Sequence, residues 1–303
     1  ILLSSVVKRY GAMSKDMEFH ILGIDVNTGK KLFETSVEDS KYAVEIINGK
    51  PEGDKIQLYG LYFDKDEKTG KAKSLGICSV KIDFTGKVLE RQYLSWAKDV
   101  SKLLPANDKG KIEDVGYMFF HNFIKTADGK IFGIAESYKK GVSGVGVALS
   151  VLGGGNAGLA KMTIEDFYIF EFTPEFKLNS VRLVEKTKNT IELPAGYEFM
   201  SPQVLARLML MFGYFDYQFT QFTKDNSVIS VGYLDYENRK GEKDGWVFGT
   251  MNYLDNEWTS DKIKFSSSAN RFGVLMGKPG YVLVYEYFRK EKRMDVRLEK
   301  INL

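Results

Sequence analysis

The chain has 303 residues, 44% of them hydrophobic and 27% charged, which is typical of a globular protein and excludes a disordered, collagen-like or coiled-coil chain. Its 43 Lys and Arg against 40 Asp and Glu give a net charge of +3, too small and too evenly spread for a nucleic-acid partner. A single cysteine, Cys78, excludes an internal disulfide and a thiolate metal cage.

Short alternating apolar runs, separated by turn signals, recur along the chain and predict β-hairpins. The first covers residues 18–37, around Asn27-Thr28-Gly29. The others are predicted at residues 43–63 about 49–53, 77–93 about Thr85-Gly86, 118–138 about Asp128-Gly129, 167–184 about Pro174-Glu175, 219–234 about Asp225-Asn226, and 247–265 about Asp255-Asn256. Three blocks of four strands result, at residues 42–96, 117–186 and 214–265, and three more strands follow at 272–276, 281–288 and 294–301.

Repeated four-stranded meanders, rich in aromatic residues (17 Tyr, 21 Phe), predict an all-β chain folded as a β-propeller, with a sandwich or a large barrel as the alternative. We expect about five blades, between four and six, in a single domain over residues 1–303, with short helical insertions on one face. Pairing of N-terminal with C-terminal strands would close the ring and hide the edges of an open array.

Two of the hairpins share a sequence pattern. Residues 24–32 read IDVNTGKKL, and residues 80–89 read VKIDFTGKVL. Both resemble the outer hairpin of bacterial β-propeller repeats, most closely quinoprotein-like repeats, and the whole chain is similar to uncharacterised bacterial propeller families. The resemblance implies the propeller fold. It implies no quinone, because Phe33 and Glu90 stand near the place where those repeats carry tryptophan.

Adjacent strands of a meander run in opposite directions, so turns within hairpins fall on one side of the sheets and connections between hairpins fall on the other. The long connections all belong to this second side, and they are residues 64–74, 97–116, 139–164, 187–213 and 235–245. Because binding and catalytic residues gather on elaborated loops over a rigid scaffold, we expect any functional site on the side of the long connections.

One of these connections predicts a helix. Residues 201–213 have Ser201 as a cap, Pro202 at the first helical position and Gly213 just beyond the end. Arg207 is the only charge in this segment. We therefore expect the helix to be covered on most sides, as a plug or roof of the propeller, and docking of a partner is the alternative.

Two other long connections have distinct compositions. Apolar spacing from Trp96 to Leu104, ahead of Pro105, predicts a short amphipathic helix that packs on the core. Residues 141–160 contain seven glycines and no charge, which argues against a packed helix. We expect a loop or a small-residue hairpin there, and an apolar lid, a partner contact or a membrane-touching tip is the alternative.

Motifs for known chemistry are weak. Neither His20 nor His121 has the context of a Ser-His-acid triad, and both are predicted to be strand residues. Residues 64–70 only faintly resemble a calcium loop, because Lys68 stands at a ligand position. Residues 153–158 are glycine-rich but lack the Lys-Ser/Thr pair of a phosphate-binding loop. The sequence therefore predicts no metal and no cofactor.

Carboxylate pairs for glycoside chemistry need only two acids across a cleft. Glu136, near the end of one predicted strand, and Glu165 with Asp166, at the start of the next, would both approach the side of the long connections. These three are the candidate catalytic residues, and structural or solvated roles are the alternative for each of them.

The sequence supports three functional hypotheses. The first is a non-catalytic binding or interaction module that presents a loop-rich face to a protein or glycan partner. The second is a carboxylate-dependent glycan hydrolase or lyase, and the third is a structural assembly subunit. No run of about 18 apolar residues predicts a membrane-spanning helix. Because the chain begins with Ile1, we expect a secreted or periplasmic protein, with a cytoplasmic location as the alternative.

Overall fold

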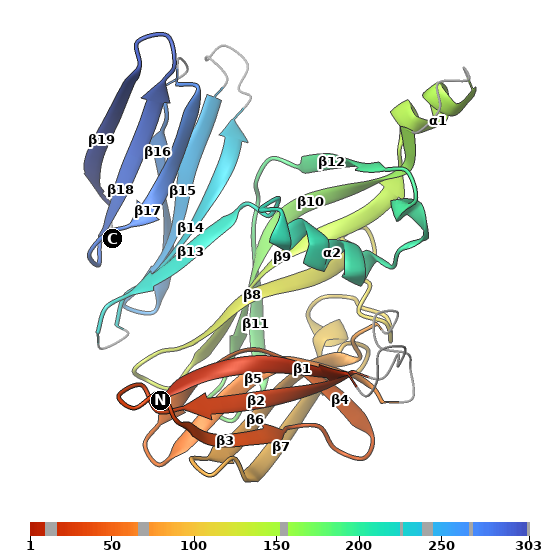
Figure 1. The fold of residues 1–303 in the computed structure, drawn as a ribbon, viewed down its shortest axis with the longest axis vertical. Coiled ribbons are helices and arrows are strands. Elements are labelled where there is room, and N and C mark those ends of the chain that lie inside the picture. Colours follow the sequence, from red (N-terminus) through yellow and green to blue (C-terminus); the bar gives the residue numbers. More distant parts are fainter. Residues whose placement is uncertain are drawn as a thin grey trace.

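The structure is a computed structural model that describes residues 1–9, 17–65, 73–151, 157–224, 227–237, 245–266 and 269–301. Its described strands form five antiparallel sheets that follow one another along the chain (Figure 1). The first sheet contains β1 (Leu2–Arg9), β2 (Met17–Ile24) and β3 (Lys31–Ser36). The second contains β4 (Tyr42–Glu52), β5 (Lys55–Asp64), β6 (Gly76–Asp83) and β7 (Val88–Ser95).

The third sheet is the largest, with β8 (Tyr117–Lys125), β9 (Ile131–Val142), β10 (Ala157–Phe172) and β11 (Leu178–Val184), and β12 (Asn189–Pro194) also pairs with β10. The fourth contains β13 (Tyr217–Phe222), β14 (Ile229–Glu237), β15 (Gly245–Leu254) and β16 (Glu257–Lys264). The last contains β17 (Arg271–Met276), β18 (Tyr281–Phe288) and β19 (Arg293–Lys300). The described helical segments are η1 (Val100–Lys102), α1 (Gly144–Val151), η2 (Tyr197–Phe199) and α2 (Pro202–Met211).

The predicted all-β class and the repeated antiparallel meanders are confirmed. Most described hairpin turns form where their residues predict them, but the turn expected over residues 49–53 is displaced to residues 53–54, because β4 continues to Glu52. In the two segments that share a pattern, Asp25 accepts hydrogen bonds from the backbone N–H of Asn27 and Thr28 at 2.8 and 3.0 Å, and Asp83 accepts one from Thr85 at 2.9 Å. Each turn then uses a glycine with positive φ, as turn geometry favours. The predicted turn residues 225 and 226 lie outside the described residues.

Apolar cores lie between consecutive sheets, not within one sheet. Each of four buried clusters contains residues from two successive sheets. One pair from each cluster is Ile21 with Ile56, Tyr59 with Phe123, Phe167 with Tyr233, and Phe248 with Val284. The rings of Tyr59 and Phe123 stack at 5.4 Å, and those of Phe167 and Tyr233 lie 5.0 Å apart. The sheets therefore pack face to face in chain order.

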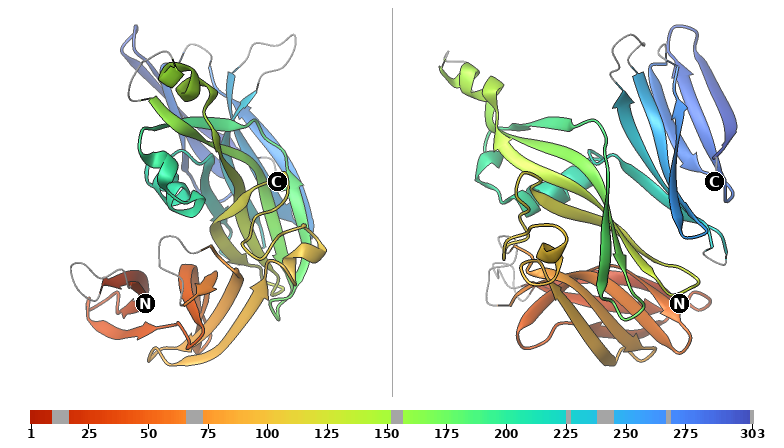
Figure 2. Two further views of the ribbon diagram at one scale, coloured as in Figure 1. Left: turned by 90° about the vertical axis from the view of Figure 1, so that its right-hand side faces the viewer. Right: turned by 180° about the vertical axis from the view of Figure 1, so that it is seen from behind.

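The ends of the chain differ from the prediction. The first sheet lies at the lower end of the long axis in Figure 1 and the last sheet lies at the upper end, and Figure 2 shows the same separation from two other sides. In the described part of the chain, β1–β3 pair only with one another, and so do β17–β19. The predicted pairing of N-terminal with C-terminal strands is therefore not among the described strand pairs. Each described ladder joins strands that are close in sequence, so local patterns predict it. Ring closure instead requires the first strands to pair with the last strands, which no local pattern determines.

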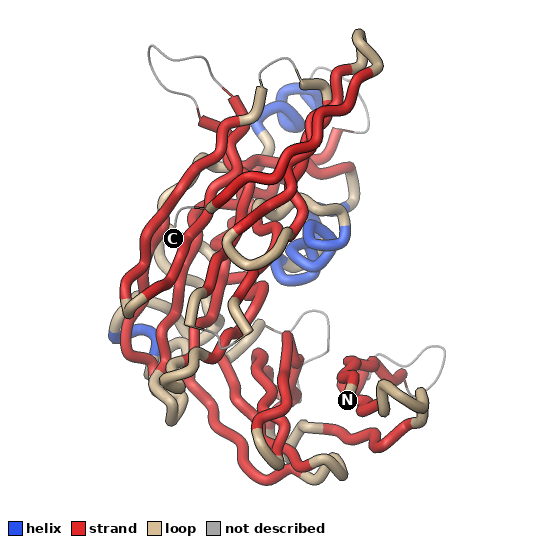
Figure 3. Tube along the Cα trace, turned by 90° about the vertical axis from the view of Figure 1, so that its left-hand side faces the viewer, coloured by secondary structure: helices blue, strands red, loops and turns tan. Residues whose placement is uncertain are grey.

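In the described residues, contacts between the short turns agree with the predicted sorting of turns and connections onto two sides, but the helical insertions do not all lie on one side. On the side of the short turns, the ammonium group of Lys125 contacts Glu52 at 2.6 Å, and that of Lys130 contacts Asn256 at 2.7 Å, so turns of three sheets lie together. Helices α1 and α2, which belong to long connections, lie together on one side of the strands, whereas η1, from the long connection 97–116, lies on the opposite side (Figure 3). Parts of two other long connections, residues 66–72 and 238–244, lie outside the described residues.

Gly60 in β5 marks a close approach of two strands in the second sheet. A Cβ atom at this position would lie 2.0 Å from the carbonyl oxygen of Glu45. We expect Gly60→Ala to lower the free energy of unfolding by about 1–3 kcal/mol, because the strand β4 must move to make room. Gly144→Ala is the matched control, since nothing lies within 4 Å of its Cβ position. Equal urea midpoints for Gly60→Ala and the wild type would contradict this expectation.

Candidate functional site

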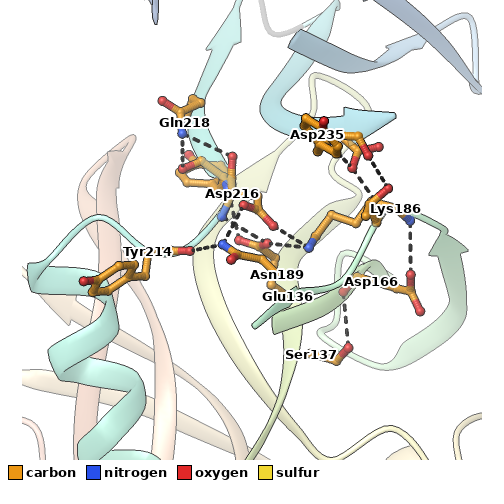
Figure 4. Close-up of polar contacts among 12 residues, drawn as sticks. Glu136, Ser137, Asp166, Lys186, Asn189, Tyr214, Asp216, Gln218 and Asp235 are labelled. Carbon is orange, nitrogen blue, oxygen red and sulfur yellow. Dashed lines mark hydrogen bonds and ion pairs between the residues drawn. The ribbon is translucent and has the colours of Figure 1, made fainter. Parts of the chain in front are cut away.

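A buried cluster of charged side chains joins the third sheet to the fourth (Figure 4). Glu136 of β9 lies 3.6 Å from the ammonium group of Lys186, which follows β11, and Lys186 lies 2.5 Å from the carboxylate of Asp216, which precedes β13. His121 of β8 approaches Glu136 with its Nε2 at 2.9 Å. The side chains of Glu136 and Lys186 are completely buried.

The position of Glu136 follows from strand register and from its backbone partners. It stands opposite Phe119 of β8 and Phe167 of β10, in the middle of the sheet. Its carboxylate accepts hydrogen bonds from the backbone N–H of Asp216 at 3.3 Å and of Tyr217 at 3.0 Å. Glu136 of the third sheet thus holds the start of β13, the first strand of the fourth sheet, in place.

The cluster contains two carboxylates for one lysine. Burial raises the pKa of Asp216 to about 6, and Glu136 adds to this rise, whereas Lys186 opposes it. The ring of His121 stacks on Tyr217 with 4.5 Å between ring centres and meets the edge of Phe215 at 5.0 Å. These contacts leave little room for a substrate, so the cluster is built as a polar joint between sheets.

A second group of hydrogen bonds fastens the connection that carries Lys186. The backbone N–H of Lys186 donates to Asp166 at 3.1 Å, and that of Thr187 donates to Asp235 at 3.0 Å. The amide of Asn189 donates to Asp216 at 3.2 Å. The connection is thereby held from both the third and the fourth sheet, as Figure 4 shows.

The three predicted acids lie close together in the structure, but each has partners. Glu165 and Asp166 occupy an irregularity in the ladder between β9 and β10, beside Glu136. Lys139 and Lys188 contact Glu165 at 2.8 and 2.9 Å. Burial alone would raise the pKa of Glu165, but hydrogen bonds from the two lysines hold it below its usual value. Asp166 in turn accepts a hydrogen bond from the backbone N–H of Lys186, so all three acids have structural partners.

Sequence reasoning identified Glu136 and the strand positions of both histidines. It missed Lys186 and Asp216, because their partners come from other sheets and no local spacing connects them. The one available signal was the position of Asp216 between Phe215 and Tyr217, where a charged residue interrupts an aromatic run.

Helix α2 covers a small pocket between the second and third sheets. The pocket has a volume of about 70 Å³, and its lining includes residues of three long connections: Ser74, Gly110, Gln203 and Arg207. Tyr117 and Tyr138 add aromatic surface to the lining. Arg207 forms an ion pair with Glu45 of β4, which holds the helix over the pocket. The side-chain oxygen of Gln203 is buried and has no hydrogen-bond donor among the described residues.

The helix prediction for residues 201–213 is confirmed, but its expected burial is only partly correct. Ser201 caps α2 by accepting a hydrogen bond from Val204 at 3.3 Å, and Leu205 and Met209 are buried. The last turn is open instead, because Met211 is 78% exposed. Helix α2 roofs the pocket with one face and presents an apolar end to solvent.

The other two connections also depart from prediction. Trp96 and Val100 are buried as expected, but only the short η1 forms there, and Leu103 is half exposed. In the glycine-rich segment, residues 144–151 form the helix α1, which composition argued against. Ser143 supports it by accepting a hydrogen bond from Gly146 at 2.8 Å. The helix projects from the molecule (Figure 1), but its glycine face packs on β10, where a Cβ atom at Gly146 would lie 1.8 Å from the carbonyl oxygen of Gly158. This contact offsets the low helix propensity of the segment. Residues 152–156 lie outside the described residues.

The described part of the chain contains no cluster of three or more His, Cys, Asp or Glu residues that could hold a metal ion. The calcium-like segment 64–70 lies mostly outside that part. None of the helices in the described ranges has the length and apolar character needed to cross a membrane.

The structure thus defines an all-β protein of successive antiparallel sheets with a polar joint and a roofed pocket. Residues 1–302 match the model of a family of unknown function (DUF6770), and the chain belongs to that family. A search of curated proteins found no match.

Solved structures similar to the chain include two propeller-type domains and a neuraminidase-like protein. The WD40 domain of SCAP from fission yeast is 9% identical, with a TM-score of 0.27 over 94% of this chain and 74% of that chain. The N11 neuraminidase-like protein of A/flat-faced bat/Peru/033/2010 (H18N11) is 10% identical, with a TM-score of 0.28 over 93% and 69%. The β-propeller domain of the Trilobed protease from Pyrococcus furiosus is 8% identical, with a TM-score of 0.27 over 85% and 69%. Structural similarity at TM-scores of 0.27–0.28 supports no inference about function.

Proposed function

We propose that the chain is a non-catalytic binding module whose α2 side recognises a protein or glycan partner. The pocket beneath α2 is the observation that carries the proposal. Its volume of about 70 Å³ suits an anchoring group, such as one side chain or one edge of a sugar ring, because a water molecule occupies about 30 Å³ in the liquid. Pockets that receive a single anchor are common in recognition surfaces.

The chemistry of the pocket indicates what this anchor carries. The buried oxygen of Gln203 needs a hydrogen-bond donor, and a sugar hydroxyl or a peptide N–H would supply it. Tyr117 offers a ring face for stacking, and Arg207 with Glu45 offers a donor and an acceptor at the helix. Exposed apolar side chains at the two ends of α2, Phe199 and Met211, would surround the anchor with further contact area.

The contacts of the candidate acids also favour binding over hydrolysis. Glu136 is completely buried and accepts two backbone hydrogen bonds. Glu165 contacts two lysines, and Asp166 accepts a hydrogen bond from the connection after β11. Each acid therefore has a structural contribution that explains its presence.

The test is binding of the purified chain to an array of immobilised oligosaccharides and an array of immobilised peptides. We expect binding on one of the two arrays, and we expect Gln203→Ala to weaken it by about 5- to 100-fold, because a pocket hydrogen bond is lost. Arg182→Ala is the control, since Arg182 is exposed on β11, outside the pocket lining. Absence of binding on both arrays, or equal binding by Gln203→Ala, would reject the proposal. Cleavage of an arrayed oligosaccharide that Glu165→Gln abolishes would favour the hydrolase instead.

A further inference from the structure

The buried cluster between the third and fourth sheets places an amine against a carboxyl group. The Nζ atom of Lys186 lies 2.5 Å from the Oδ2 atom of Asp216. Because a carbon–oxygen bond of this kind measures about 1.2 Å, Nζ lies within about 3.7 Å of the carboxyl carbon. Reacting atoms attack each other from about 3–3.5 Å, so only a small displacement separates the two groups from a reactive geometry.

Both groups are shielded from solvent. The side chain of Lys186 is completely buried and that of Asp216 is 9% exposed, and the ring centre of Phe167 lies 5.8 Å from Nζ. In an apolar surrounding an ion pair loses much of its advantage over the neutral pair, so a proton passes from the ammonium group to the carboxylate more easily than in water. Burial also raises the pKa of Asp216 to about 6, which favours the protonated carboxyl group that this transfer yields.

Two further side chains stand where a condensation needs them. The Oε1 atom of Glu136 lies 3.6 Å from Nζ of Lys186, close to the protons that this nitrogen must release. The amide of Asn189 donates a hydrogen bond at 3.2 Å to Oδ1 of Asp216, the oxygen that gains negative charge during attack on the carboxyl carbon. Figure 4 shows both side chains beside the contact between Lys186 and Asp216. The cluster therefore combines a nucleophile, an electrophile, a general base and a donor to the oxyanion.

We propose that the side chains of Lys186 and Asp216 condense within the folded chain to an amide bond (an isopeptide bond), with release of one water molecule. The ammonium group first gives a proton to Oδ2, which leaves a neutral amine beside a neutral carboxyl group. The nitrogen then bonds to the carboxyl carbon, and Glu136 takes a proton from the nitrogen. Glu136 returns this proton to the Oδ2 hydroxyl group, the bond between carbon and Oδ2 breaks, and water leaves. The balance closes, because the ion pair and the amide with water are both neutral and the Glu136 carboxylate is regenerated.

The bond would join the third sheet to the fourth covalently. Lys186 and Asp216 are 30 positions apart, and the segment between them contains β12 and α2. A crosslink of this kind restricts the unfolded chain, so the linked protein should unfold at a higher urea concentration. The ion pair is the starting state of the reaction, so the effects of charge and pH at these two residues belong to the chain before the bond forms.

The first test is the mass of the intact chain, measured by mass spectrometry before and after prolonged incubation of the folded protein. We expect the mass to fall by one water molecule, and trypsin should then release a branched peptide that joins residues 183–188 to residues 208–224. The same incubation in urea should leave the mass unchanged, because only the fold brings the two side chains together. Lys186→Arg keeps the positive charge but has no amine for this reaction, so it should keep its full mass.

The second test examines Glu136 as the general base. Glu136→Gln should slow the growth of the linked fraction about a hundredfold, because a carboxamide cannot take the proton from the nitrogen. Glu165→Gln is the matched control, since Glu165 is a neighbouring acid that contacts Lys139 and Lys188 instead, and it should link at the wild-type rate. Circular dichroism checks that both variants fold. Equal rates for Glu136→Gln and the wild type would overturn the reaction as written.

A folded wild-type chain that keeps its full mass after incubation would overturn the proposal, and so would a loss of water that Lys186→Arg shares. Loss of water that maps to Asp128-Gly129 would do the same, because an aspartate before glycine can cyclise with its own backbone. Lys188 and Glu165 form an internal control, since they lie 2.9 Å apart but Lys188 is 63% exposed, and no branched peptide should join them. None of these measurements involves the pocket beneath α2, so they test the bond independently of the proposed binding function.

Discussion

Lys186→Met should destabilise the protein by about 3–5 kcal/mol, because it leaves the carboxylates of Glu136 and Asp216 buried without their cation. The change keeps an unbranched apolar stem and removes only the ammonium end, so the effect mainly reports the charge. Urea-induced unfolding at pH 7, followed by the fluorescence of Trp258 in a background where Trp96 and Trp246 are replaced by Phe, measures it. Trp258 packs on Phe132 of the third sheet with 5.1 Å between ring centres, so it reports on the same junction.

Two further variants make the result specific. Lys188→Met removes a lysine that contacts Glu165 but is 63% exposed, and it should cost less than about 1 kcal/mol. Adding Asp216→Asn to Lys186→Met should recover part of the lost stability, because one buried charge is removed. If both lysine variants unfolded at the same urea concentration, the cluster would not be the joint between the sheets.

The second large effect is a dependence on pH that comes from Asp216. Its pKa is raised from 3.8 to about 6 by burial, so the folded chain holds a proton that the unfolded chain has released. Stability contributed by this group is therefore lost as pH rises from about 4 to 6, by roughly 3 kcal/mol. We expect the difference in unfolding free energy between the wild type and Asp216→Asn to shift against the wild type by this amount between pH 4 and pH 7.

Asp83→Asn provides a control of opposite sign. Hydrogen bonds from the side chain of Thr85 and from the backbone lower the pKa of Asp83, and the group is exposed in a hairpin turn. Its contribution is present above the unfolded pKa of 3.8 and is lost as pH falls below it, so the difference between wild type and Asp83→Asn should be nearly flat from pH 7 to pH 4 and turn against the wild type at lower pH. A flat difference for Asp216→Asn across this range would show that the carboxylate is ionised throughout.

Local chemistry explains which parts of the fold were predictable. The turns at Asp25 and Asp83 are determined within five residues, because an aspartate oxygen accepts backbone hydrogen bonds and a glycine adopts positive φ. The α2 helix was equally local, with Ser201 as its cap. The turn signals therefore predicted the four consecutive strands of each block, but not β12, which pairs with β10 from a long connection.

Features that depend on distant partners were not predictable. Lys186 reads as an ordinary lysine between two strands, and only the packing of the third and fourth sheets gives it two carboxylates. The exposed last turn of α2 and the separation of the first and last sheets were not predictable for the same reason. In both places burial depends on which distant surfaces come into contact. Helix α1 was not predicted because intrinsic propensity takes no account of tertiary contacts, and here Gly146 packs directly on Gly158 of β10.

The placement of each apolar core between consecutive sheets has a consequence for how the protein loses its structure. A sheet in the middle is stabilised by two neighbours, and a terminal sheet is stabilised by only one in the described chain. Stability then behaves as a series of adjoining units, each with its own free energy and a coupling to the next. Fluctuations should begin at the extremities and travel inward, with the charged junction between the third and fourth units deciding whether the two halves melt together or separately.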